Sequence, residues 1–245
     1  MKNSPTKKNS KALLTILVPV YNEEKTLERM LDRVTSLPID SYEVIVVNDA
    51  SRDKSAIIIE AFIKKFQNPN VKIQVHTHPK NKGKGAGIQT GIKNALGEYF
   101  VIQDADLEYN PKEIPKLLEE AMRNNRPVVY GSRFLGKIEG MAGANYQANR
   151  FYNLLVRTLY RTNITDMHTC YKMVKTELIR ELKMTSDGFD YAPELVSKLL
   201  KRNIEIYEIP ISFKGRTKKQ GKKIGYKDGV ECTISLIKYR FSKKG

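Results

Sequence analysis

The sequence predicts an α/β protein built on a mostly parallel β-sheet, and two observations lead to this prediction. Over the first 135 residues, short and nearly continuous apolar runs alternate with longer segments whose apolar residues recur at helical spacing. Strands that are apolar on both faces are typical of parallel sheets, which helices cover on each side. The chain has 245 residues, 40% of them hydrophobic, which supports one sizeable core and excludes a disordered chain.

Each element of the first half has its own signal. The expected strands are apolar runs and cover residues 13–20, 43–47, 71–75, 99–102 and 128–130. The expected helices between them are amphipathic and cover residues 24–36, 57–66, 86–96 and 111–122. Gly97 follows the third helix and Pro111 begins the fourth, which are positions that favour these two residues.

The second half is less regular. Residues 136–143 contain three glycines and predict a mobile loop. Further helices are expected at residues 145–160, 193–200 and 229–241. The last of these places four apolar residues on one face: Val230, Ile234, Ile237 and Phe241. Residues 204–213 alternate like a strand, and Pro210 within them indicates an edge position or a bend.

The net charge of +16, from 43 Lys and Arg against 27 Asp and Glu, lies mostly at the two ends. Residues 1–11 contribute +4 and residues 214–245 contribute +9, so the body between them is nearly neutral. A nucleic-acid-binding module usually spreads its cations over a whole face, and the chain has no known nucleic-acid-binding motif. That reading stays a remote alternative, and the charge favours a phosphorylated small molecule or an anionic membrane surface.

No part of the sequence predicts a membrane-spanning helix or a signal peptide. The longest apolar stretch, residues 12–21, is ten residues long, whereas a spanning helix needs about 20. Polar residues 22–24 follow it, where a signal peptide would have its cleavage site. Cys170 and Cys232 form no disulfide framework. We therefore expect a cytoplasmic protein.

Polar clusters follow four of the expected strands, at the edge where ligands bind in open parallel sheets. They are residues 19–23, 48–51, 103–108 and 131–134. In the third cluster Asp104 and Asp106 stand two residues apart, and Glu108 continues the alternation. Carboxylates in this arrangement can share Mg²⁺ or Mn²⁺, whose remaining ligands are often phosphate oxygens. The cluster therefore predicts a nucleoside diphosphate site.

Two further segments suit a phosphorylated ligand. Residues 81–87 are rich in glycine and precede a helix, although they match neither a Walker P-loop nor a dinucleotide fingerprint. Six of residues 214–223 are basic, which describes either a solvated loop or a lid that supplies cations to a diphosphate.

Taken in order, these motifs resemble the GT-A glycosyltransferases of family 2, and within them the dolichyl-phosphate mannose and glucose synthases. The resemblance rests on residues 18–24, 48–51, 81–85, 104–108 and 131–134, and extends to residues 166–172, 221–224 and 227–229. It implies a Rossmann-like, mostly parallel sheet flanked by helices, with an acceptor-side segment towards the C-terminus. It covers nearly the whole chain.

The resemblance also implies a role for each matching residue. The nucleotide-binding residues would be Pro19, Tyr21, Glu23, Asp49, Lys82, Gly83, Asp104, Arg133, Arg216 and Lys222. The ligands of Mg²⁺ or Mn²⁺ would be Asp104, Asp106 and Glu108, and the catalytic residues Asp106, Asp166 and Arg216. Asp166 would lie near the acceptor.

We expect one catalytic domain with four parts. They are a basic tail (1–11), a nucleotide-sugar-binding half (12–135), an acceptor-side half (136–213) and a basic loop with an amphipathic helix (214–245). Three departures from the family pattern stand out. Asn48 replaces an acid, Glu108 stands where mannose synthases tend to have Gln, and no membrane helices follow.

The implied reaction transfers a hexose, with inversion, from UDP-glucose or GDP-mannose to a polyprenyl or dolichyl phosphate. The partners would be the donor, the lipid acceptor and an anionic membrane surface at the cytoplasmic face. No nucleic-acid partner is expected, and the protein could form a homo-oligomer. The alternative is transfer to a glycan hydroxyl, which requires a carboxylate base; Asp166 and Asp190 are its candidates.

Overall fold

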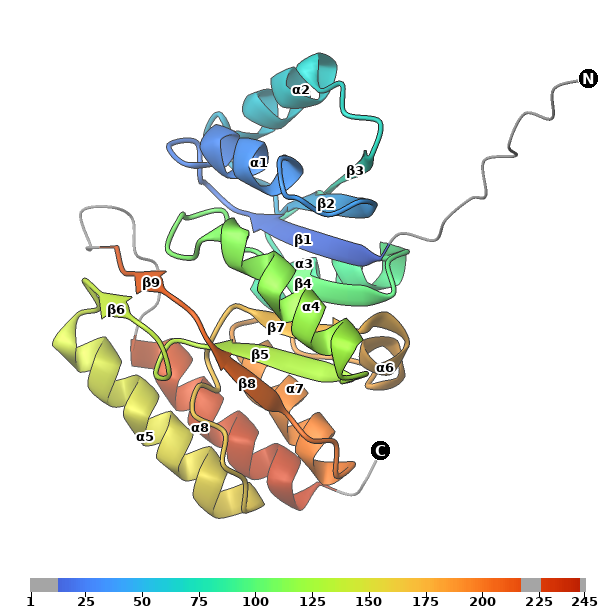
Figure 1. Ribbon diagram of the computed structural model, residues 1–245. Helices are drawn as coiled ribbons and strands as arrows, with labels where there is room; N and C mark the ends of the chain where they lie inside the picture. The colour runs from blue at the N-terminus through green and yellow to red at the C-terminus, as the bar shows by residue number, and fades with distance from the viewer. Residues whose placement is uncertain (1–12, 217–225, 243–245) are drawn as a thin grey trace, which may run out of the picture.

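A seven-stranded sheet of order β3-β2-β1-β4-β7-β5-β8 forms the centre of the computed structural model, which describes residues 13–216 and 226–242 (Figure 1). The strands are β1 (Leu14–Val20), β2 (Tyr42–Asn48), β3 (Val71–Thr77), β4 (Tyr99–Ile102), β5 (Val128–Ser132), β7 (Lys172–Lys175) and β8 (Tyr207–Pro210). All neighbours pair in parallel except β7, which is antiparallel to both β4 and β5. The predicted α/β class with a mostly parallel sheet is confirmed.

Helices cover both faces of this sheet. They are α1 (Leu27–Thr35), α2 (Ser55–Lys65), α3 (Lys84–Asn94), α4 (Ile114–Arg123), α5 (Gly143–Tyr160), α6 (Thr176–Glu181), α7 (Tyr191–Lys201) and α8 (Tyr226–Phe241). In Figure 1, α1 and α4 lie in front of the sheet, and α3 and α6 lie behind it. The three helices α5, α7 and α8 pack on one another below the β5 end of the sheet.

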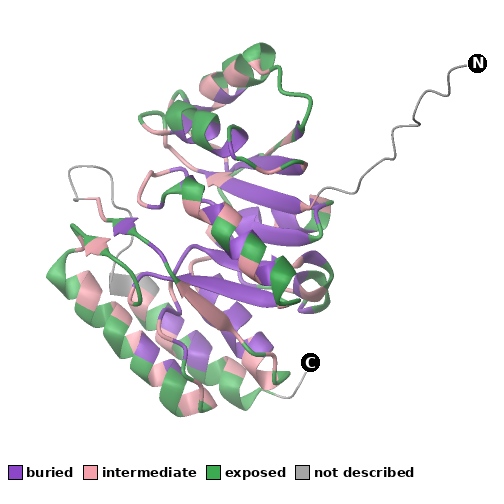
Figure 2. Cartoon of the chain, in the orientation of Figure 1, coloured by how far each residue is buried: buried purple, intermediate pink, exposed green. Residues whose placement is uncertain are grey.

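The burial of the strands explains their nearly continuous apolar sequences. Every residue of β2 and β4 is buried, whereas in the edge strand β3 only Val71 is buried and the other residues are half-buried or exposed. Figure 2 shows the central strands buried and the outward sides of the helices exposed. Because helices exclude water from both faces of the central strands, apolar residues are required at successive positions there.

Four details differ from the sequence-based expectation. The predicted loop 136–143 contains a short strand, β6 (Ile138–Glu139), which pairs with β9 (Phe213–Lys214). The expected strand 204–213 is divided into β8 and β9, and β8 takes the predicted edge position. The strand β7 and the helix α6 were not expected. Lysines stand at both ends of β7, so only two apolar residues remain between them, too few to predict a strand.

One of these lysines, Lys172, lies inside the core with 1% of its surface exposed. Its Nζ donates a hydrogen bond to the Thr169 carbonyl, and lies 5.3 Å from the ring centroid of Tyr130 and 5.9 Å from that of Tyr191. Burial disfavours the charged ammonium and lowers the pKa of Lys172 to about 7.

This burial predicts a pH-dependent contribution to stability. Between about pH 7 and 10, Lys172 is neutral in the folded chain but protonated in the unfolded one, so the free energy of unfolding rises with pH. One such group adds a slope of at most about 1.4 kcal/mol per pH unit. Urea unfolding from pH 7 to 9.5 should show that Lys172→Met loses this slope. The matched variant Lys175→Met, at the end of β7, should keep it; equal slopes for both would contradict the prediction.

Candidate functional site

A cavity of about 390 Å³ opens at the carboxyl ends of β1, β2 and β4. It is lined by Pro19, Val20, Tyr21, Glu23, Val47, Asp49, Asn81, Gly83, Lys84, Gly87, Asp104, Ala105, Asp106, Glu108, Phe189 and Arg216. Because parallel strands end at the same edge of a sheet, clusters that are distant in sequence meet here.

Asp49 organises one wall of this cavity. Its carboxylate accepts hydrogen bonds from the backbone N–H groups of Lys82 (2.9 Å) and Gly83 (2.8 Å), and lies 2.7 Å from Nδ1 of His78. The other ring nitrogen of His78 lies 2.8 Å from the hydroxyl of Thr90 on α3. Asp49 therefore bends the glycine-rich loop onto the end of β2 and fixes the start of α3.

The first turn of α3 packs directly on the loop before α7. A Cβ atom on Gly85 would lie 2.1 Å from the backbone oxygen of Ser186, so only glycine fits there. The N–H of Ala86 donates to the carbonyl of Asp187 at 3.1 Å. The buried carboxylate of Glu194 accepts from the N–H groups of Thr185 and Ser186, which holds this loop in place. The same loop carries Phe189 to the cavity wall.

The acidic residues of the cavity are paired with two cations of the chain. Nζ of Lys84 lies 2.6 Å and 2.8 Å from the two carboxylate oxygens of Asp104. The guanidinium of Arg216 donates to Asp106 at 2.8 Å and to Glu23 at 3.2 Å. The N–H of Arg216 also donates to Glu108 at 2.7 Å.

Arg216 reaches the cavity because the small second sheet positions it. The N–H of Lys214 donates to the Glu108 carbonyl at 2.9 Å, and that of Gly215 donates to the Glu139 carbonyl at 2.8 Å. Phe213 packs against the ring of Tyr109 at a centroid distance of 5.2 Å. These contacts place the C-terminal part of the chain directly on the segment that follows β4.

The pKa values of these groups show how crowded the negative charge is. Burial, together with Asp104 and Glu108, raises the pKa of Asp106 to about 7, although Arg216 acts in the opposite direction. Burial is the largest single effect on Asp104 and raises its pKa, but the charge and hydrogen bond of Lys84, the hydrogen bond of Cys170 and the charge of Lys172 together outweigh it, so the net shift is downwards. The neighbouring carboxylates raise the pKa of Arg216 against the effect of burial. The cluster thus favours a cation.

The oxygen donors of this cluster fit Mg²⁺ or Mn²⁺, which prefer carboxylates. Over residues 13–216 and 226–242, no three acidic, His or Cys side chains are arranged as a metal site. Asp104 faces Lys84, and Asp106 and Glu108 face Arg216. A divalent ion at this cluster would exchange with these cations of the chain.

Most of the expected site residues line the cavity, and a few lie elsewhere. Lys82 contributes its N–H to Asp49 while its side chain is exposed, and Lys222 lies outside the described residues. Asn81, Lys84 and Phe189 line the cavity although they were not among the expected site residues. Lys84 follows Gly83 directly, which was a usable signal; nothing in the sequence around Phe189 indicated its place.

Arg133 and Asp166 are not among the residues that line this cavity, and they pair with each other. Nε and a terminal nitrogen of Arg133 each lie 2.7 Å from a different carboxylate oxygen of Asp166, which is fully buried. The N–H of Arg133 adds a third hydrogen bond at 2.9 Å, and its side chain also donates to Asn149 at 3.1 Å. The structure therefore brings these two predicted residues together and joins the end of the first half to the second.

Comparison with known proteins identifies the family. The model of glycosyl transferase family 2 matches residues 15–183, which is more than half of the chain. The chain belongs to glycosyl transferase family 2. This match includes the strands β1 to β5 and the acidic segment with Asp104 and Asp106.

Two relatives of this family 2 member are polyprenyl-phosphate glycosyltransferases. A dolichol-phosphate mannosyltransferase of Pyrococcus furiosus is 27% identical over 86% of this chain and 60% of its own length. An undecaprenyl-phosphate 4-deoxy-4-formamido-L-arabinose transferase of Pseudomonas fluorescens is 31% identical over 64% of this chain and 50% of its own length. The chain thus spans half to three-fifths of these relatives.

Solved structures confirm the GT-A fold. Glucosyl-3-phosphoglycerate synthase from Mycobacterium tuberculosis, with Mn²⁺, uridine diphosphate and phosphoglyceric acid, matches with a TM-score of 0.68. The match covers 94% of this chain and 79% of that one at 16% identity. S. aureus TarS 1–349 in complex with UDP-GlcNAc matches with a TM-score of 0.62 at 18% identity, over 93% of this chain and 66% of that one.

The close packing at Gly85 predicts a loss of stability in Gly85→Ala. Because the new methyl group would overlap the Ser186 carbonyl, the free energy of unfolding should fall by roughly 1–3 kcal/mol in urea titrations. Gly143→Ala is the matched control, since nothing lies within 4 Å of a Cβ built at this position in the first turn of α5. Equal free energies of unfolding for the two variants would contradict the prediction and show that residues 186–187 move away from the new methyl group at no cost.

The pairing of Lys84 with Asp104 predicts competition with a metal ion. Lys84→Met removes a cation 2.6 Å from the carboxylate, so the affinity for Mn²⁺ without nucleotide should rise roughly tenfold, or about 1.4 kcal/mol. Electron paramagnetic resonance of free Mn²⁺ measures this directly. Lys93→Met, exposed on the same helix, should leave the affinity unchanged. An unchanged or lower affinity in Lys84→Met would contradict the competition.

Proposed function

We propose that this glycosyltransferase moves a hexosyl group from a nucleoside diphosphate sugar, of the UDP-glucose or GDP-mannose type, to a polyprenyl phosphate with inversion. The observation that carries the donor assignment is the cavity in which Asp104 pairs with Lys84, and Asp106 and Glu108 pair with Arg216. The acceptor assignment is supported by the two relatives, which are a dolichol-phosphate and an undecaprenyl-phosphate transferase.

In this proposal the chain positions the donor between two groups of side chains. Pro19, Tyr21 and Asp49 line the part of the cavity that receives the base and ribose. Asp104, Asp106 and Glu108 would hold Mg²⁺ or Mn²⁺, which would supply positive charge to the departing diphosphate. Arg216, released from the carboxylates, supplies a further positive charge to the same leaving group.

The chemistry of a phosphate acceptor places few demands on the protein. A phosphate monoester has a second pKa of about 6, so its oxygen is already anionic at pH 7. A bond forms between this oxygen and the anomeric carbon while the bond from that carbon to the donor phosphate breaks. Its electron pair leaves with the nucleoside diphosphate, and no proton has to be removed.

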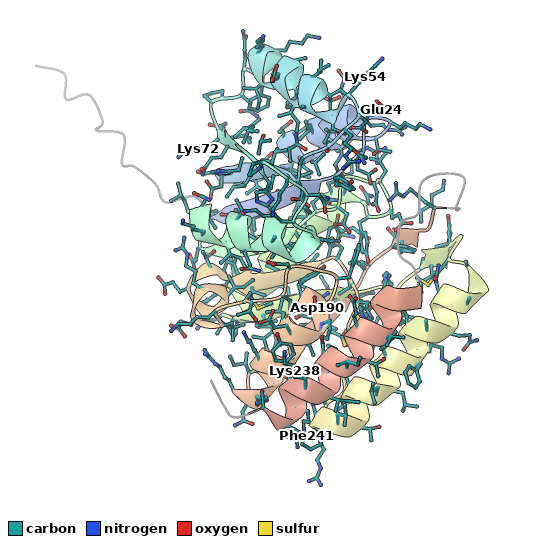
Figure 3. All side chains as sticks on the ribbon, turned by 180° about the vertical axis from the view of Figure 1, so that it is seen from behind. Glu24, Lys54, Lys72, Asp190, Lys238 and Phe241 are labelled. Carbon is teal, nitrogen blue, oxygen red and sulfur yellow. The ribbon has the colours of Figure 1, made fainter. Side chains whose placement is uncertain are left out.

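The surroundings of Asp166 support a phosphate acceptor over a glycan hydroxyl. A hydroxyl acceptor requires a general base. Asp166 is fully buried and accepts three hydrogen bonds from Arg133, so its carboxylate is engaged. The second candidate base, Asp190, lies at the start of α7 (Figure 3), where the hydroxyl of Ser235 donates to it at 3.3 Å.

The lipid acceptor implies that the protein works at an anionic membrane surface, where the basic terminal segments gain energy from lipid charge. The tail 1–11 and the loop with Lys222 lie outside the described residues. Over residues 13–216 and 226–242, no helix is both long and apolar enough to cross a bilayer. We therefore propose a peripheral contact for the part of the chain described.

The proposed reaction predicts the outcome of a transfer assay. With Mn²⁺ and labelled UDP-glucose or GDP-mannose, one donor should yield a labelled lipid when polyprenyl phosphate is supplied. Arg216→Met should lower kcat roughly 10²-fold, because it removes charge at the leaving diphosphate. Arg202→Met, at the far end of α7, should retain full activity. Label that appears only on a glycan acceptor would contradict the proposal.

A further inference from the structure

The outer surface of α5 and α8 carries large apolar side chains that are exposed in the described structure. On α8 a single stripe is formed by Val230, Ile234, Ile237 and Phe241, exposed to 43%, 59%, 45% and 76%. On α5, Phe151 and Leu154 are exposed to 54% and 62%. We call these six residues the α5/α8 face. Single exposed apolar residues are common on protein surfaces, but a group of large ones side by side marks an interaction surface.

The two helices present this face together because they lie side by side (Figures 1 and 3). The hydroxyl of Tyr152 donates to the Gly229 carbonyl at 2.6 Å, and that of Tyr160 to the Leu236 carbonyl at 3.1 Å. Nε of Arg240 donates to the Leu159 carbonyl at 2.7 Å. These bonds join the flanks of the helices, so the exposed stripes of both point away from the core.

Positive charges surround the α5/α8 face. Arg150 and Arg157 are exposed on α5, which carries no acidic residue along its whole length. Lys238 and Arg240 are exposed in the last turn of α8, where Figure 3 shows Lys238 close to Phe241. Among residues 229–242, whose side chains the structure describes, the acidic residue is Glu231. Apolar side chains interleaved with Lys and Arg suit the boundary between lipid headgroups and acyl chains.

We propose that the α5/α8 face docks on an anionic lipid surface, with its apolar side chains among the acyl chains and its cations on lipid phosphates. A second copy of the chain fits this face less well, because Arg150, Arg157 and Lys238 of both copies would face one another. The inference extends the proposed function, in which the acceptor lies in a bilayer. Binding to lipid does not itself depend on transfer.

The docked helices also hold the acceptor half of the protein. Asn149 on α5 accepts a hydrogen bond from Arg133 at 3.1 Å. Asn153, one turn further on, accepts from the N–H of Met167 at 2.9 Å and donates to the carbonyl of Thr165. A surface that binds the exposed side of α5 is therefore separated from the Arg133–Asp166 pair by this one helix. This connection places the C-terminal half, rather than α1 or α2, against the bilayer.

Sedimentation with vesicles of phosphatidylglycerol and phosphatidylcholine tests the inference on the full chain. At low salt the wild type should sediment with these vesicles, and the combined variant Phe151→Ser, Leu154→Ser, Ile234→Ser and Phe241→Ser should bind at least tenfold more weakly. All four positions are exposed, so folding should persist, as circular dichroism can verify. Ile57→Ser on α2, where the side chain is 67% exposed, is the matched apolar control and should bind like wild type.

A charge variant separates the two components of this binding. Arg150→Gln, Arg157→Gln and Lys238→Gln together should weaken binding to vesicles with phosphatidylglycerol and reduce its dependence on salt. Binding to pure phosphatidylcholine should change little. Equal losses on both kinds of vesicle would show that the cations do not contact lipid charge, which overturns this part of the inference.

Other outcomes overturn the docking inference itself. One is a serine variant that binds vesicles as tightly as the wild type, because contact through other segments would then suffice. Another is a wild type that stays in solution at low salt. A third is a wild-type dimer that the serine variant converts to a monomer without vesicles, which makes this face an interface between copies.

The transfer reaction is tested separately. With a short-chain, water-soluble polyprenyl phosphate, the serine variant should keep wild-type activity, because its cavity is unchanged. If the wild type sediments with vesicles but transfers no sugar to this acceptor, the proposed function fails and the docking inference stands. If transfer occurs without vesicle binding, the reverse holds.

Discussion

Arg216 lies against Glu23, Asp106 and Glu108, and much of the tertiary structure serves to bring it there. Buried carboxylates that crowd one another are costly unless a cation compensates them. In this chain the cation comes from a residue 110 positions beyond Asp106. The pairing of β6 with β9 and the hydrogen bond from the Lys214 N–H to the Glu108 carbonyl hold Arg216 beside these carboxylates. The proposed donor cavity is therefore completed by Arg216 from the C-terminal half.

A similar constraint applies at the opposite wall of the cavity. Asp49 holds the backbone at Lys82 and Gly83, and the missing side chain of Gly85 lets the loop 185–189 approach the start of α3. Glu194 fixes that loop from the side of α7. Both halves of the chain thus contribute backbone and side chains to one cavity. Ligand chemistry at its centre depends on contacts between elements that are far apart in sequence.

The part of the fold that could be predicted from sequence is the part with strong local signals. The strands β1, β2 and β4 are mostly apolar because helices cover both faces of the sheet, and α1 and α4 are amphipathic because each packs on the sheet along one side. In contrast, β6 and β9 have two residues each and show no periodicity. The strand β7 contains only two apolar residues between Lys172 and Lys175, so its sequence does not indicate a buried strand. Lys172 is nevertheless buried, and burial lowers its pKa.

The residue types and spacing alone determined the α/β class, the acidic group Asp104, Asp106 and Glu108, and the clusters that follow β1, β2 and β4. These features are local, because periodic burial and strand ends leave their mark on neighbouring residues. Only the tertiary structure decided that Lys84 and Arg216 neutralise the acidic group, that Phe189 joins the cavity wall, and that Arg133 pairs with Asp166. These contacts join residues separated by a strand or more, and their partners depend on how helices and sheets pack in three dimensions.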